Sequence, residues 1–228
     1  DKNKIFIKMT QINNKVLELK QALLKMMHLT QNQLLKGREA IMEFDKDLAH
    51  EILFNENRLN AYELAIDNNC ENILALYNPV AIDLRFVLSV YKINSNLERI
   101  GDYAAGIARF ILHFNQALEP KVLVDLRFLE MYDAILKMFN YIVDGFTNED
   151  TKLARKVFPI DDTVNAINIA TTDIVIPIMK NHPEQMEQLL YLVSIIRKME
   201  RIGDLTKNMA EDTIFYLEAK VLKHQEKP

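Results

Sequence analysis

The stretch Glu98-Arg-Ile-Gly-Asp102 decides the fold, because the same five residues return at Glu200-Arg-Ile-Gly-Asp204. Each copy ends a longer similar stretch, at residues 92–102 and 194–204. A chain that repeats itself near its middle and again near its end is expected to hold two copies of one structural unit. In each copy a Glu and an Asp stand four residues apart, so on a helix their two carboxylates share a face.

Composition places the chain among ordinary globular proteins. It has 228 residues, of which 49% are hydrophobic and 26% charged, enough for one or two domains with a sizeable core. Only five glycines and six prolines are present, so few residues can break a helix and long helices are expected. The net charge of -4 argues against nucleic-acid binding, which usually needs a basic domain.

The cellular compartment follows from what the sequence lacks. No stretch approaches the roughly 18–20 apolar residues of a membrane span, and the first residues do not resemble a signal peptide. Cys70 is the single cysteine, so no intramolecular disulfide can form, which fits a reducing compartment. We therefore expect a cytoplasmic protein.

Helical periodicity runs through nearly the whole chain and predicts six long helices. Asn78-Pro79 is the clearest boundary, with Asn78 as the N-cap and Pro79 as the first residue of the third helix. Pro159 and Pro177 are expected to perturb the fifth helix. The expected helices cover residues 4–44, 45 or 47 to 77, 79–114, 122–146, 147–180 and 181–222. Asp45 or Asp47 is the expected cap of the second helix, and residues 147–149 are the expected cap of the fifth.

These helices fall into two groups of three, separated by a short break at residues 116–121. We predict an all-α fold of two tandem, sequence-related three-helix bundles, formed by residues 1–116 and 117–228. Short connections favour antiparallel neighbours, and helices of 30–40 residues would be about 45–60 Å long, so the molecule should be elongated.

Polar residues form rows on four of the expected helices. The rows on the second and fifth helices use the same offsets of 4, 7 and 11 residues, which strengthens the duplication. We take these rows as candidate metal ligands: Glu98 and Asp102; Glu200 and Asp204; Glu56, Asn60, Glu63 and Asp67; Asp161 and Asn165, continued by Asn168 and Thr172.

A row of acids on a helix is usually a solvated face, but two features here favour a ligand. Like charges four residues apart cost a few tenths of a kcal/mol unless something neutralises them. The glycine inside each pentapeptide costs about 1 kcal/mol relative to alanine, which suggests close approach to a neighbouring helix or a ligand. Carboxylate and amide oxygens suit hard cations. No Cys or His joins the rows, which argues against structural zinc, and no repeated Glu-x-x-His motif supports di-iron redox chemistry.

The repeated pentapeptide, together with Pro79-Val-Ala-Ile-Asp-Leu-Arg85, resembles the PhoU family of phosphate-signalling proteins. The resemblance covers nearly the whole chain. It implies two similar three-helix bundles that bind multinuclear metal clusters, with iron first and manganese, magnesium, zinc or calcium as alternatives. Glu98/Asp102 and Glu200/Asp204 match the family's metal-binding motif, and Glu63/Asp67 matches it in form.

The resemblance also implies a function. Members act as negative regulators of phosphate uptake, linking the ATPase subunit of a phosphate ABC transporter to a membrane sensor histidine kinase. Such a protein needs no catalytic activity and meets the membrane only through its partners. In the second half Asn165, Asn168 and Thr172 depart from the acidic pattern, so a metal there would be held more weakly.

Three alternatives stay open at this point. A carboxylate-bridged metalloenzyme, such as an oxidase or a phosphohydrolase, would use the same acids. A purely structural helical scaffold would leave them as a solvated face. Acidic faces bridged by metal would also allow a homodimer.

Overall fold

The computed structural model describes the backbone of residues 2–222 and the side chains of residues 11–222. It consists of α1 (Lys2–Met42), α2 (Lys46–Tyr77), α3 (Ala81–His113), α4 (Pro120–Asp125), α5 (Phe128–Thr147), α6 (Thr151–Arg155), α7 (Val157–Asn181), the 3₁₀ turn η1 (Pro183–Gln185) and α8 (Met186–Glu218).

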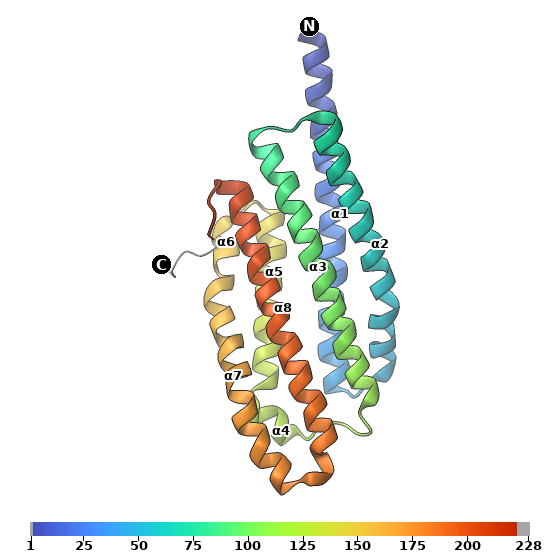
Figure 1. Cartoon of the computed structure of the whole chain (residues 1–228), viewed down its shortest axis with the longest axis vertical. Helices are drawn as coiled ribbons and strands as arrows, with labels where there is room; N and C mark the ends of the chain where they lie inside the picture. The colour runs from blue at the N-terminus through green and yellow to red at the C-terminus, as the bar shows by residue number, and fades with distance from the viewer. Residues whose placement is uncertain (1, 223–228) are drawn as a thin grey trace.

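Six of the helices within residues 2–222 have 20 or more residues, and this part of the chain contains no strand. The prediction of an all-α fold with two related three-helix units is confirmed. Figure 1 shows an elongated molecule with α1, α2 and α3 on one side and α5, α7 and α8 on the other. The predicted division between residues 116 and 117 stays a prediction.

One hydrophobic core runs through both halves, because α3 packs against α8 along most of its length (Figure 1). At one end the rings of Phe86 and Tyr216 lie 5.1 Å apart, and at the other end those of Phe110 and Tyr191 lie 5.5 Å apart. The two helices therefore run antiparallel. This register places the two copies of the pentapeptide at the same level, near the middle of the interface.

The boundary at Asn78-Pro79 was predicted with the right position and the wrong role. Asn78 ends α2 in the left-handed conformation, with φ of 49°, and Val80 in an extended conformation precedes α3. A residue before proline is disfavoured in the right-handed helical region, and Asn tolerates the left-handed one at little cost. Asp45, in contrast, caps α2 as predicted by accepting a hydrogen bond of 2.8 Å from the backbone N–H of Asp47.

The second half is more broken than periodicity predicts. The expected helix over residues 122–146 is divided into α4 and α5 at Arg127, which has φ of 51°. The expected cap at residues 147–149 lies one residue further on, where Asp150 caps α6 through the backbone N–H of Lys152 at 2.8 Å.

The two prolines of the fifth predicted helix act differently. Pro159 has no N–H, and its ring would clash with the carbonyl of Arg155, so α6 ends there and α7 begins at Val157. Pro177 lies inside α7 without ending it. The sixth predicted helix begins with η1 and ends at Glu218 rather than at residue 222.

Within the described part of the chain, no helix combines the length and the apolar character needed to cross a membrane.

Each repeated glycine lies against an apolar side chain of the neighbouring helix. A Cβ on Gly101 would lie 2.4 Å from Cδ1 of Leu59 on α2, and a Cβ on Gly203 would lie 3.3 Å from Cγ1 of Val164 on α7. The close approach predicted at these glycines is therefore an approach to the neighbouring helix, where packing leaves little room for a side chain.

We expect Gly101→Ala to lower the free energy of unfolding by about 1–2 kcal/mol, because overpacking against the buried Leu59 outweighs the gain in helix propensity. Gly203→Ala should cost less, since Val164 leaves more room. Urea denaturation of both variants measures the difference, and an equal loss in both would contradict this packing argument.

Candidate metal centre

Four carboxyl groups from two helices gather in the first half, and we call Glu63, Asp67, Glu98 and Asp102 the first acidic cluster. Burial, then the charges of Asp102 and Glu63, raise the pKa of Glu98 to about 7. Burial and the charges of Asp67 and Asp102 also raise the pKa of Glu63. Each group thus feels acids on the other helix, and the predicted rows on α2 and α3 do face each other.

The buried side chain of Asn94 belongs to the same cluster, although it was not predicted. Its Nδ2 donates hydrogen bonds to Oδ1 of Asp67 at 2.8 Å and to the carbonyl oxygen of Glu63 at 2.9 Å. Its own Oδ1 is buried without a partner among the described residues. A signal existed in the sequence, because Asn94 precedes Glu98 by four residues and so extends the row on α3.

The donor atoms of this cluster suit a hard cation, but the present positions of its side chains do not. Four carboxylates and one unpartnered amide oxygen are donors that Mg²⁺, Mn²⁺, Ca²⁺ or ferric iron accept. In the arrangement of the described side chains, however, no three His, Cys, Asp or Glu residues converge closely enough to hold a metal ion. Glutamate side chains would have to change rotamer to bind one.

Two of the predicted ligands on α2 lie outside the cluster. Both carboxylate oxygens of Glu56 accept hydrogen bonds from Arg109, at 3.0 and 2.9 Å, so this acid already has a cation. Asn60 is exposed. The predicted row spans 11 residues from Glu56 to Asp67, about 16 Å along a helix, which is too long for one site.

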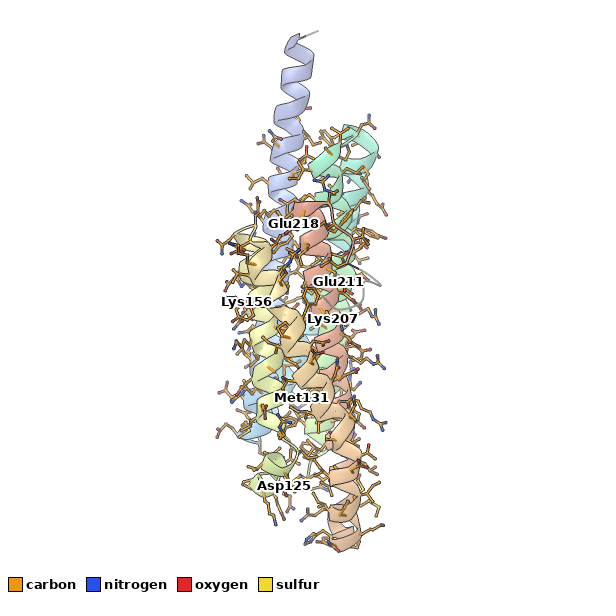
Figure 2. The ribbon with its side chains drawn as sticks, turned by 90° about the vertical axis from the view of Figure 1, so that its left-hand side faces the viewer. Asp125, Met131, Lys156, Lys207, Glu211 and Glu218 are labelled. Atoms are coloured by element: carbon orange, nitrogen blue, oxygen red, sulfur yellow. The ribbon has the colours of Figure 1, made fainter. Side chains whose placement is uncertain are left out.

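The predicted acids of the second half also come together, but around a lysine. Nζ of Lys207 lies 2.7 Å from Oδ2 of Asp161 and 3.7 Å from Oδ1 of Asp204. Nδ2 of Asn165 also donates to Oδ2 of Asp161, at 3.2 Å, while Oδ1 of this buried Asp has no partner among the described residues. Asp161, Glu200 and Asp204 form the second acidic cluster, and Lys207 contacts Asp161 and Asp204. Figure 2 labels Lys207 on α8.

The pKa shifts of Glu200 and Lys207 agree with this geometry. Burial and the charge of Asp204 raise the pKa of Glu200, while Arg201 and Lys207 work to lower it. Burial works to lower the pKa of Lys207, but the hydrogen bond and charge of Asp161 outweigh it and raise that pKa. The second cluster thus contains a cation of its own, and a metal ion at Asp161 would have to displace the ammonium group of Lys207. In this arrangement the second cluster suits a metal ion less well than the first.

A single position explains the difference between the halves. Lys207 follows Asp204 by three residues, and the residue three after Asp102 is the buried Ala105. Asn and Thr in place of acids predict a weaker second site from the sequence alone. The lysine three residues after the repeat is the sequence signal that this prediction missed.

Comparison with known proteins covers both halves of the chain. A family profile described as "PhoU domain" matches residues 23–111 and again 128–213. A protein of Aquifex aeolicus described as "Phosphate-specific transport system accessory protein PhoU homolog" is 33% identical over 208 residues, which cover 91% of this chain and 93% of the relative.

Two crystal structures share the fold. PhoU from Pseudomonas aeruginosa superposes with a TM-score of 0.85 at 29% identity, over 91% of this chain and 99% of that one. The phosphate transport system regulatory protein PhoU from Streptococcus pneumoniae gives a TM-score of 0.83 at 27% identity, over 93% and 99% of the two chains.

The raised pKa of Glu98 predicts a pH dependence of the metal-free protein. Because burial lifts this pKa from 4.5 to about 7, the folded state favours the protonated acid. Its contribution to stability is present below pH 4.5 and is lost as the pH rises through 7. In EDTA, the free energy of unfolding should fall by about 1 kcal/mol between pH 5 and 8, after allowance for solvent screening.

Glu98→Gln should remove most of this pH dependence and stabilise the protein at pH 8. Urea denaturation at the two pH values measures both effects. Glu200→Gln is the matched comparison and should remove less of the pH dependence, since Arg201 and Lys207 work against the rise in the pKa of Glu200. A pH dependence that survives in Glu98→Gln would assign it to another group.

Removing Lys207 should leave the second acidic cluster able to bind an added cation. Lys207→Ala leaves the buried Asp161 without its cation and should lower the free energy of unfolding by about 2–3 kcal/mol. Millimolar Mn²⁺ or Mg²⁺ should then restore part of the loss, as measured by thermal unfolding. If neither ion restores stability, the lysine does not occupy a cation's place.

Proposed function

Because the chain belongs to the PhoU family, we propose that it is an accessory protein of phosphate-specific transport that represses phosphate uptake and phosphate-starvation signalling. The observation that carries this proposal is the family match over both halves of the chain. The names of the relatives support it, since they describe an accessory protein of phosphate transport and, in Streptococcus pneumoniae, a regulatory one.

In this proposal the protein works as an adaptor and not as a catalyst. It would bind the ATPase subunit of a phosphate ABC transporter and a membrane sensor histidine kinase, lie in the cytoplasm, and meet the membrane only through these partners. Turnover in an oxidase or phosphatase assay that Glu98→Gln abolishes would favour the metalloenzyme alternative instead.

An apolar strip at the start of α3 supports the adaptor proposal. Val80, Leu84, Leu88 and Tyr91 are exposed by 71%, 37%, 39% and 47%, respectively. Their spacing of four, four and three residues places them along one side of the helix. Neighbouring exposed apolar residues of this kind are typical of a contact surface for another protein.

The adaptor proposal is tested by repression in cells and by direct binding. The chain should restore repression of a phosphate-starvation reporter in bacteria that lack their own PhoU protein. Immobilised chain should retain the transporter ATPase subunit and the kinase. Full repression without binding to either partner would contradict the adaptor mechanism, and no repression would contradict the regulatory function itself.

We expect Val80→Asp combined with Leu88→Asp to weaken retention of at least one partner tenfold or more. Asp at position 80 is a good N-cap for α3, so the first change should not unfold the helix. The matched control is Val124→Asp with Leu190→Asp, at residues exposed by 72% and 54% on other helices. Equal loss in both double variants would exclude the strip as the contact surface.

We further propose that the first acidic cluster binds a hard metal ion, with iron first and manganese, magnesium, calcium or zinc as alternatives. Glu63, Asp67, Glu98 and Asp102 would supply carboxylate oxygens, and Asn94 its unpartnered amide oxygen. Burial and the charges of Asp102 and Glu63 raise the pKa of Glu98, which supports this proposal, because a bound cation would stabilise the charged carboxylate. A metal ion would provide positive charge that joins α2 to α3.

Elemental analysis should find metal in the wild-type protein and little in Glu98→Gln/Asp102→Asn. The matched control, Glu200→Gln/Asp204→Asn, should keep the wild-type content, since Lys207 already neutralises that half. Metal-free wild-type protein after loading with Fe³⁺ or Mn²⁺ would contradict the proposal for the first half. Loss of metal in the control would contradict the asymmetry.

A further inference from the structure

A groove with a basic floor lies between the two halves of the molecule. Its volume is about 660 Å³, and most of its lining, which we call its floor, comes from α8. α8 lies between α3 and α7 (Figure 1). The floor carries Ser194, Arg197, Lys198 and Arg201, whose spacing places them on one face of the helix. Tyr103 and Phe110 of α3 and Asn168 of α7 line its sides, and Glu200 is the acid in its lining.

Lys198 is held in place by α3 and not simply directed into solvent. Its Nζ lies 5.5 Å from the ring centroid of Tyr103 and 5.6 Å from that of Phe110. Two aromatic faces attract an ammonium group and limit its motion. The lysine is therefore positioned before any ligand arrives.

Gly106 makes room for this lysine. A Cβ at position 106 would lie 2.9 Å from Nζ of Lys198 and 3.0 Å from its Cε. A glycine inside a helix costs about 1 kcal/mol relative to alanine, so the chain gives up helix stability where it positions an ammonium group. The equivalent residue of the second half is Asn208, so the glycine is not a feature of the repeat.

The charges in the groove sum to a positive value. Arg197 is exposed and makes no ion pair with the described residues, and Lys198 contacts rings and no carboxylate. Arg201 lies 3.4 Å from Glu200 and 3.5 Å from Asp204, so these two acids are offset in part. Arg197 and Lys198 remain as cations without a countercharge, on a protein whose net charge is -4.

We propose that this groove binds a phosphate-type oxyanion, either inorganic phosphate or the phosphate of a small phosphorylated metabolite. A guanidinium group binds such oxygens through two parallel hydrogen bonds, an ammonium group adds a point charge, and the amide of Asn168 can donate a further hydrogen bond. The proposal goes beyond the regulatory function and does not depend on the metal centre.

The test is a titration of the metal-free protein with inorganic phosphate and, separately, with ATP. Isothermal calorimetry in EDTA, with ionic strength held constant by NaCl, keeps metal binding and general screening out of the result. We expect saturable binding of at least one of the two. Stronger binding of ATP would identify a phosphorylated metabolite as the ligand class, and binding of phosphate alone would identify the free ion. No binding of either would overturn the proposal.

Arg197→Gln/Lys198→Gln should weaken binding at least tenfold. The matched control, Lys121→Gln/Lys137→Gln, removes the same charge from exposed lysines on other helices and should bind as the wild type does. An equal loss in the two variants would show general charge attraction and overturn the site.

Gly106→Ala provides a second readout that net charge cannot explain. The added methyl group should displace Lys198 and weaken oxyanion binding severalfold, although no charge changes. Thermal unfolding of the same variant checks that the protein stays folded. Unchanged affinity in this variant would contradict the role of the positioned lysine. A lost regulatory function with intact oxyanion binding would separate the two proposals.

Discussion

The antiparallel packing of α3 against α8 determines the position of every other functional feature. Aromatic contacts fix this pair at both ends, Phe86 with Tyr216 and Phe110 with Tyr191. Because the pair is buried along its length, the polar rows of both helices must face outward or toward α2 and α7. The first acidic cluster therefore lies between α3 and α2, the second lies between α8 and α7, and the basic groove is lined by α3, α7 and α8.

The two halves share one repeated pattern, but they differ in how far nearby cations offset the repulsion between their acids. In the first half burial and the charges of Asp102 and Glu63 raise the pKa of Glu98 to about 7, and Arg99 offsets only part of this rise. In the second half Lys207 lies 2.7 Å from Asp161 and offsets part of that repulsion, although burial and Asp204 still raise the pKa of Glu200. A duplicated motif therefore does not imply a duplicated site, because one nearby residue decides whether an external cation is needed.

Features that depend on neighbouring residues in the chain were predicted well from the sequence, and contacts between distant residues were not. Periodicity and the Asp45 cap anticipated the helices, since both depend on neighbours in the chain. The predicted role of Asn78 was wrong because Asn is common both before the first turn of a helix and after the last one. The proline after Asn78 decided that it ends α2. The contact of Lys198 with Gly106 could not be predicted, because nothing in the sequence pairs residues 92 positions apart.

The sequence by itself determined the helical fold, the duplication and the acidic rows, because helix periodicity maps a linear pattern directly onto one face. It also contained the motifs that placed the chain in its family. Only the tertiary structure decided which row stays uncompensated, which acid is already paired, and where cations gather. Those outcomes depend on distances between helices, and a Coulomb interaction changes with a few ångströms that no spacing in the chain records.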